Sequence, residues 1–533
     1  MGGESGTAPC QVRKGGNAMG WKKWVLWTCC FALFLAAFVP VTSAFYVDPK
    51  KKTLEVLGKV QSRVSFRLQD SGGFTQPIDI YAGNLVQWRN LALIEINHDL
   101  KLLTKELGVL TPLKALDIRA KYHLVGRFMY EAVYDVGPEA FQEVRERDKD
   151  NIDSFKQQYD LWEFYVDLSR GPWFFRLGRQ NLAWGETDIF RLLDGVNPLD
   201  NTFGGPFEDL DDRRIPLWML RGSYNFGTVG PVSTLTLEGF WVPGFWDARV
   251  APLSPAGTAY APPQPPSPLP TYLMTPGKTG SNSRWGVRVM GLLADNFNVS
   301  LVHYKSYLDI PALRFGVGES PLDAYTELSY PDVQVTGGSL SFWEEHTDVI
   351  VRAEVAWFWD EPVFIPDINT PLVALPITIP GVPGLPAKGR IPKKDMFKFM
   401  IGLDKMLWVR PLNPKKTFLI SLQYFGTWVQ DYDKRMRIPL ALYPNATDFS
   451  AAKETEGTIT GLVNTEYLHG DLIPQLAVAY DVRGACLFQP QVNFIFEPFR
   501  VSVQYTAVVG NMVSLGAYRD RDQITFIFSY LLN

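Results

Sequence analysis

Residues 349–359 read VIVRAEVAWFW, and this segment has the pattern that decides the fold class of the chain. Its odd-numbered positions are all apolar, whereas the two charged residues, Arg352 and Glu354, stand at even-numbered positions. Successive side chains of a β-strand point to opposite faces, so the segment is predicted to be a strand with one apolar and one charged face. The same alternation recurs at 118–124, 396–405, 418–427 and 522–533, and the chain after residue 44 shows almost no helical period.

The connections between these strands alternate in length along the chain. Short turns stand at 170–172, 227–231, 294–296, 344–348, 412–416 and 497–498. Between them lie long loops near residues 137–158, 182–214, 243–282, 308–331, 360–394 and 430–455. Turns and loops alternate in this way when they lie at opposite ends of an up-and-down barrel. The chain is therefore predicted to be all-β, a transmembrane antiparallel barrel of about 16–18 strands with long extracellular loops, each strand about ten residues long.

The N-terminal region has the features of an export signal. Lys22 and Lys23 precede an apolar run at 24–41, and the small residues Thr-Ser-Ala follow it at 42–44. A basic start, an apolar centre and a small-residue exit are typical of a secretory signal, so residues 1–44 are predicted to be an N-terminal extension and cleavable signal peptide. A single membrane anchor is the alternative, because the run approaches the roughly 20 residues that a spanning helix needs.

Removal of this signal would leave one domain. Translation starts at Met1 or at Met19, and residues 45–533 are predicted to form a single outer-membrane barrel domain. Cys486 would be the only cysteine of that domain. No internal disulfide is then possible, so we expect continuous backbone pairing to hold the fold together.

The composition argues against several classes of function. The net charge is −4 with 20% charged residues, so the chain lacks the basic surface of a nucleic-acid-binding protein. The five histidines show no metal-ligand spacing, and no nucleophile elbow or phosphate-binding loop is present. We expect no enzyme, no cofactor, no metal and no nucleic-acid partner. An acidic run at 208–212 could offer oxygen ligands to calcium, but the following Arg213 and Arg214 are expected to neutralise it.

One strand and the loop after it have the composition of a pore constriction. Residues 176–200 read RLGRQNLAWGETDIFRLLDGVNPLD, a strand end followed by a loop rich in glycine and acidic residues. We expect residues 186–214 to fold inward and narrow the pore, with a loop that only caps the rim as the alternative. The candidate pore residues are Arg176, Arg179, Gln180, Trp184, Glu186, Asn197 and Asp200.

Charged residues at inward positions of the strands are expected to line a wet lumen. Each alternates with apolar neighbours, and rings of charge in a pore select which solutes pass. In the alternative interpretation they are only solvated strand faces. The candidates are Arg119, Lys121, Glu163, Asp167, Arg288, Arg352, Glu354, Lys398 and Asp404. The proline-rich, apolar loop 361–394 is expected to fold against the barrel mouth or to meet the membrane or a partner.

Three short motifs carry a family resemblance. They are Arg176-x-Gly178-Arg179-Gln180, Trp184-Gly185-Glu186 and Asn197-Pro198-x-Asp200, in that order. Together they resemble the bacterial outer-membrane β-barrel family called domain of unknown function 1302. The first motif is also distantly similar to one in alginate-export barrels. The resemblance implies an outer-membrane channel that acts beside lipid or hydrophobic-compound exporters of the resistance-nodulation-division class.

We therefore expect a porin-like channel in the outer membrane of a Gram-negative bacterium, passing or exporting small solutes or hydrophobic compounds. Its expected partners are outer-membrane lipid, lipopolysaccharide and the barrel assembly machinery, with an exporter complex as a further candidate. Two alternatives stay open. The chain could serve as the partner of an inner-membrane exporter of lipids or hydrophobic compounds, or as a plugged barrel that acts as an adhesin or structural protein.

Overall fold

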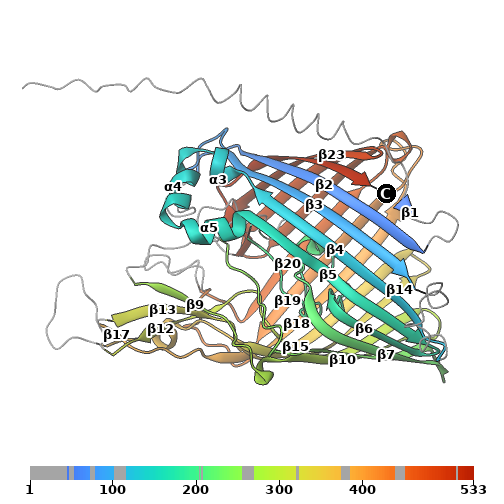
Figure 1. Ribbon diagram of the computed structural model, residues 1–533, viewed down its shortest axis with the longest axis horizontal. Helices are drawn as coiled ribbons and strands as arrows, with labels where there is room; N and C mark the ends of the chain where they lie inside the picture. Colours follow the sequence, from blue (N-terminus) through green and yellow to red (C-terminus); the bar gives the residue numbers. More distant parts are fainter. Residues whose placement is uncertain are drawn as a thin grey trace, which may run out of the picture.

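The computed structural model describes residues 45–46, 53–71, 78–100, 116–202, 205, 208–254, 269–319, 323–373, 385–438, 451–511 and 514–532. Within them, eighteen antiparallel strands form one closed barrel (Figure 1). Each strand pairs with the next barrel strand along the chain, and the last strand, β24, pairs with the first long one, β2. The predicted barrel is confirmed, at the upper end of the predicted strand number.

The barrel strands are β2 (Leu54–Arg67), β3 (Leu85–Asp99), β4 (Arg119–Glu131), β5 (Gln157–Arg170), β6 (Trp173–Gln180), β7 (Leu217–Val229), β8 (Val232–Val242), β10 (Arg284–Leu293), β11 (Phe297–Tyr307), β14 (Asp332–Glu344), β15 (Val349–Pro362), β18 (Lys393–Leu407), β19 (Phe418–Val429), β20 (Thr455–Asn464), β21 (Leu472–Asp481), β22 (Ala485–Phe496), β23 (Phe499–Gly510) and β24 (Gln523–Leu532). A two-residue strand, β1 (Phe45–Tyr46), pairs with β2 just beyond the end of β24.

The two faces of the barrel wall have the alternation that the sequence predicts. In β15, Val355 and Trp359 point away from the lumen and are 47% and 44% exposed, whereas the inward Glu354 is 1% exposed. In β18, Ile401 and Leu403 are likewise outward and exposed. A closed ring leaves no open strand edge, and an exposed apolar belt is the surface that a transmembrane barrel presents to lipid.

Short turns and long loops lie at opposite ends of the barrel, as predicted. The turn end carries the connections 171–172, 230–231, 294–296, 345–348 and 497–498. The loop end carries 132–156, 181–216, 243–283, 308–331, 363–392 and 430–454. Two connections depart from the pattern, since 482–484 is a tight turn at the loop end and 100–118 is a long connection at the turn end.

The long loops contain secondary structure that strand alternation did not reveal. Three helices form a lobe between β4 and β5: α3 (Val133–Val136), α4 (Glu139–Arg147) and α5 (Lys149–Lys156). The expectation of almost no helix is wrong there, because helices of one to three turns are too short for a 3.6-residue period to stand out. A second lobe is a small sheet of β9 (Thr271–Met274), β12 (Ala312–Val317) and β13 (Ala324–Ser329). No helix among the described residues is long and apolar enough to cross a membrane.

The remaining elements are short: α6 (Leu210–Arg213), α7 (Pro366–Asn369), β16 (Leu372–Val373), β17 (Leu385–Pro386), and the 3-10 turns η4 (Gly280–Asn282), η7 (Leu468–Gly470) and η8 (Ser514–Tyr518). The described part of the apolar loop 361–394 folds against the barrel mouth. Val363 and Ile365 are buried there, and the Asn369 amide donates to the carbonyl of Leu313 over 2.7 Å. Residues 374–384 of that loop and the predicted signal peptide at 1–44 lie outside the described residues.

Candidate functional site

The connection between β6 and β7, residues 181–216, runs through the inside of the barrel, and we call it the strap. Trp184 of the strap is 2% exposed and meets Phe240 and Tyr304 edge to face, with ring centroids 5.1 and 6.1 Å apart. Both of those residues point into the lumen from the wall. The same apolar cluster includes Leu182, Leu192, Leu193, Val196, Leu217, Met219, Val302, Val335, Ala356 and Met400.

Two glycines let the strap lie close to the wall. A Cβ on Gly195 of the strap would stand 2.7 Å from the Tyr304 hydroxyl, and a Cβ on Gly337 of β14 would stand 2.7 Å from the Leu193 side chain. Either distance is shorter than real Cβ contacts allow. The absent side chains therefore permit this path through the lumen.

A single buried amide ties the two ends of the strap together. The Asn197 side-chain oxygen accepts the N–H of Leu182 over 2.9 Å, and its NH₂ donates to the carbonyls of Gln180 and Ile215 over 3.2 and 2.9 Å. Asp200, three residues on, accepts the N–H of Thr202 over 3.0 Å. The Asn-Pro-x-Asp motif thus closes the strap at its base.

Two inward carboxylates of the wall hold the strap in the lumen. Glu354 of β15 accepts the backbone N–H of Glu186 and, over 3.1 Å, that of Leu193. Glu238 of β8 accepts the indole N–H of Trp184 over 2.6 Å. Both carboxylates are 1% exposed, so these hydrogen bonds form away from water, where an unpaired charge would be costly.

Arg352, on the same strand as Glu354, makes further contacts with the strap. Arg352 donates to the carbonyl of Glu186 over 2.5 Å and forms an ion pair with Asp188 of the strap at 2.6 Å. It also pairs with Asp404 of β18 at 2.7 Å. Arg352 and Asp404, both predicted to face the lumen, therefore act together at the strap.

The far part of the strap is held by the opposite side of the barrel. Glu208 lies 2.5 Å from Arg89 of β3 and 3.4 Å from Arg63 of β2. Around the ring, β18 to β24 separate β2 from β15 in one direction and β3 to β14 in the other. The strap therefore crosses the lumen.

Electrostatics favour the charged form of Glu208 although it is buried. Burial raises the pKa of this carboxyl, but the charges of Arg89 and Arg63 and the hydrogen bond from Arg89 outweigh that effect and lower the pKa to about 2. Asp212 lies 3.8 Å from Lys59, and Asp211 pairs with Arg214. Because these carboxylates have different partners, the acidic run does not form one cluster.

Arg214 pairs with Asp211 of the acidic run, and the charge of Arg213 favours the ionised form of Glu208. Arg213 also donates to the side-chain oxygen of Asn201 over 2.6 Å. Among the described residues, no three His, Cys, Asp or Glu side chains are grouped so that they could hold a metal ion.

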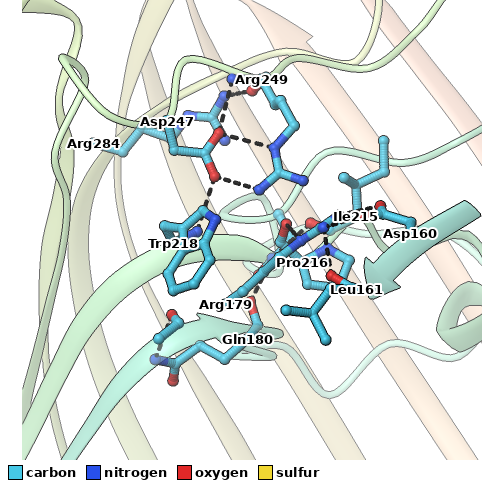
Figure 2. Close-up of polar contacts among 12 residues, drawn as sticks. Asp160, Leu161, Arg179, Gln180, Ile215, Pro216, Trp218, Asp247, Arg249 and Arg284 are labelled. Carbon is cyan, nitrogen blue, oxygen red and sulfur yellow. Dashed lines mark hydrogen bonds and ion pairs between the residues drawn. The ribbon is translucent and has the colours of Figure 1, made fainter. Parts of the chain in front are cut away.

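The basic residues of the Arg-x-Gly-Arg-Gln motif are paired at the wall. Arg176 forms a two-point ion pair with Asp167 at 2.6 and 2.8 Å. Arg179 is 6% exposed and donates to the Asp160 carboxylate and the Leu161 carbonyl, each over 2.5 Å (Figure 2). Gln180 is fully buried. Arg179 therefore stands among strand ends, with its charge balanced by a neighbour.

The other predicted lumen charges lie on inward positions, and most have partners. Glu163 accepts the amide of Asn181 over 2.8 Å, Arg288 lies 3.3 Å from Glu238, and Lys398 lies 2.6 Å from Glu361. Arg119 and Lys121, at the turn end, are exposed. Charge is thus neutralised locally around the strap and solvated at the turn end.

Sequence reasoning missed several partners of the strap. Glu238 stands at an inward position of an alternating segment, so the alternation could have identified it. Glu208 and Arg89 are 119 positions apart, and only the closed fold brings them together. Arg63 was missed for the same reason.

Replacing Asn197 with alanine should loosen the strap without opening the barrel. The change removes three hydrogen bonds and leaves buried backbone groups unpaired, which costs about 2–4 kcal/mol of local stability. Hydrogen exchange measured by mass spectrometry should show faster exchange across residues 181–216 and unchanged exchange in β2 and β24. Asn296→Ala, at a turn-end asparagine, is the matched control. Unchanged exchange in the strap of the Asn197 variant would contradict the assigned role.

Comparison with known proteins places the chain in a family. No curated protein matches it. Solved structures with similar folds include Pseudomonas aeruginosa OccK3 (OpdO), at 10% identity and a TM-score of 0.44 over 90% of this chain and 95% of that one. Acinetobacter baumannii OccAB1 matches at 10% identity and a TM-score of 0.45, over 92% and 98%. At this level of likeness no property of those proteins extends to this chain.

A family model described as protein of unknown function (DUF1302) matches residues 26–532, nearly the whole chain. The match spans every barrel strand from β2 to β24 and the whole strap. It confirms the resemblance carried by the three motifs. This chain belongs to the DUF1302 family.

Proposed function

We propose that this protein is a gated channel for small polar solutes in the outer membrane of a Gram-negative bacterium, closed by the strap. The observation that supports it most directly is the difference between the two ends of the lumen. Near the turn end, the inward side chains of Lys121 and Glu95 are 62% and 36% exposed. Beside the strap, Glu238 and Glu354 are almost fully buried. Water thus reaches charged wall residues up to the strap.

One stretch of the inner wall carries uncharged polar side chains beside the basic residues of β2, which favours polar solutes over hydrophobic ones. Hydroxyl and amide side chains of β22, β23, β24 and β2 face the lumen and bond to one another. Gln504 donates to Gln491 over 2.9 Å, and Ser502 donates to Asn493 over 2.6 Å. Such groups can exchange their bonds with a passing solute at modest net cost, because each hydrogen bond contributes only about 0.5–1.5 kcal/mol.

The contacts that hold the strap are of a kind that can break and form again, as a gate requires. Its polar contacts with the wall are hydrogen bonds and ion pairs centred on Glu354, Glu238 and Glu208. None of these is covalent, so a solute or a partner that binds the displaced strap better than the closed one shifts the population toward the open channel. The free energy for opening then comes from the difference between the affinities of that solute or partner for the displaced and the closed strap.

A plugged barrel with a structural or adhesive role is the second candidate. The observation that favours it is the apolar cluster around Trp184 and Leu193, which buries strap residues on inward wall residues. Burial of this kind stabilises the closed state by roughly 1.5–3 kcal/mol for each large side chain. If the free energy of this packing exceeds that of every contact that favours opening, the lumen stays closed.

Glu354→Ala should raise the ionic current through the purified barrel in a planar bilayer. The change removes the acceptor of two backbone N–H groups, each costing about 1–3 kcal/mol when left unpaired and buried, so the open fraction should rise at least about tenfold. Glu354→Gln keeps an acceptor and should have a smaller effect.

Glu95→Ala is the matched control for this experiment, because Glu95 is an inward carboxylate whose neighbours are Asn97 and His123 of the wall. It should leave the current as in the unmodified protein. Absence of current both in Glu354→Ala and in a chain lacking residues 187–192 would reject the channel and support the plugged barrel.

Acid should open the same gate through Glu208. The folded-state pKa of this carboxyl is lowered, so its contribution to strap stability is complete above the unfolded pKa of about 4.3 and is lost as the pH falls toward 2. Bilayer recordings should therefore show a rising open fraction between about pH 4.5 and pH 2.5. Glu208→Gln should show more openings at pH 7 and a flatter profile. Identical pH profiles in the two proteins would contradict the role of Glu208.

A further inference from the structure

A crevice of about 1000 Å³ lies at the loop end, between the helical lobe and the small sheet. Figure 1 shows the two lobes, one of α3, α4 and α5 and the other of β9, β12 and β13, projecting from the same end of the barrel. Residues of α5, of the segment after β8, and of β9 and β13 line the crevice. Its volume is at the upper end of the range for small-ligand sites.

The floor of this crevice belongs to the outer face of the barrel. Trp218 lies on the floor, while its neighbours Leu217 and Met219 are buried on the lumen side. Alternation along β7 therefore directs Trp218 outward, as it does Leu220, which is 41% exposed. Trp218 of the crevice and the lumen-facing residues thus lie on opposite faces of β7, while Ser254 at the crevice edge donates to Asn201 of the strap over 2.9 Å.

Aromatic residues connect the floor with the lipid-facing belt. The Trp218 ring meets Phe164 of β5 edge to face at 6.4 Å and lies 5.8 Å from Trp246, which is 61% exposed. Tryptophan concentrates where membrane and water meet, because its ring is apolar and its N–H is polar. The arrangement puts the crevice at the outer boundary of the bilayer.

A buried carboxylate gives the crevice a fixed shape. Asp247 accepts the backbone N–H of Trp218 over 2.9 Å and the Nε–H of Arg249 over 3.0 Å (Figure 2). The Arg284 side chain donates to the carbonyl of Arg249. Burial raises the pKa of Asp247, but hydrogen bonding and charge from Arg249 outweigh it and lower the pKa. The segment that carries Trp246 is therefore pinned to the barrel wall.

The mouth of the crevice offers positive charge to a ligand. Lys278 is exposed, and no ion pair of its side chain occurs among the described residues. The Arg249 side chain is 35% exposed, and its charge is paired with Asp247. On the α5 side, the Asp148 carboxylate accepts the amide of Asn151 over 2.9 Å. The apolar floor and the ammonium group of Lys278 together fit a molecule with an apolar chain and an anionic head.

We propose that this crevice binds an anionic lipid of the outer leaflet, with its acyl chain against Trp218, Trp246 and Leu273 and its phosphate beside Lys278. The proposal is independent of the channel function, because it concerns the outer face of the barrel. It assigns a role to the exposed Trp246, which forms one aromatic group with Trp218 and Phe164. Bound lipid would also brace the two lobes against each other.

The test is retention of lipid by the purified full chain in native mass spectrometry. The probes are dimyristoyl-phosphatidylglycerol, dimyristoylglycerol, which lacks the phosphate, and inorganic phosphate, which lacks the chains. We expect one phosphatidylglycerol to be retained and the other two probes to be lost. Lys278→Glu should weaken retention at least about fivefold, because one cation near an anionic lipid surface contributes about that much. Trp246→Ala should also weaken retention, because it removes an apolar contact of the acyl chain.

Two substitutions at the turn end are the matched controls. Trp173→Ala changes an exposed tryptophan of the belt, and Lys415→Glu changes an exposed lysine. Both should leave retention unchanged. Equal retention by all variants would mean that lipid coats the belt without a site, and retention of inorganic phosphate alone would mean an anion site. Either outcome overturns the proposal.

Discussion

The pairing of β2 with β24 is the constraint on which the rest of the structure depends. In lipid every backbone N–H and C=O must find a partner within the protein, so the sheet has to close on itself. Once it is closed, the two-residue period assigns each side chain to lipid or to lumen. The apolar belt, the charged inner wall and the space for the strap all follow from this assignment.

Wall and strap then depend on each other. Glu354 and Glu238 point into the lumen and are buried, which would be costly for an unpaired carboxylate. The strap supplies the two backbone N–H groups that bind Glu354, and its indole N–H joins Arg221 and Arg288 of the wall in binding Glu238. In return, these carboxylates give the strap a single path through the barrel. The gate that we propose and the order of the lumen therefore depend on the same few contacts.

The sequence allowed the barrel and the location of the strap to be predicted, but not its path. Alternation is a local property, so residues 349–359 revealed both faces of β15. Loop composition likewise marked residues 186–214 as the inward segment, and its residues Leu192, Leu193 and Val196 lie in the buried cluster with residues of the wall. Which wall residue meets which strap residue depends on barrel closure, as the pair of Glu208 and Arg89 illustrates. The helices α3 to α5 were missed because each is too short to impose a period.

The same limit applies to individual candidate residues. Arg179 was expected to act in the pore, and its position in the sequence says nothing about Asp160, which balances its charge. Asn197 was expected at the constriction, and its role in tying both strap ends becomes visible only when Gln180 and Ile215 are brought together. The sequence was enough to predict which face of a strand each side chain lies on. It was not enough to predict contacts between segments that are far apart in the chain.

Side-specific labelling of a lumen cysteine tests most directly that the strap divides the lumen. The protein that carries Cys486→Ser and Glu95→Cys is placed in lipid vesicles. A membrane-impermeant maleimide is then added to one side of the membrane at a time. If the strap divides the lumen, the introduced cysteine should react rapidly from the turn end and hardly at all from the loop end. Adding Glu354→Ala should restore its reaction from the loop end. Equal rates from both faces in the protein with an intact strap would contradict this division of the lumen.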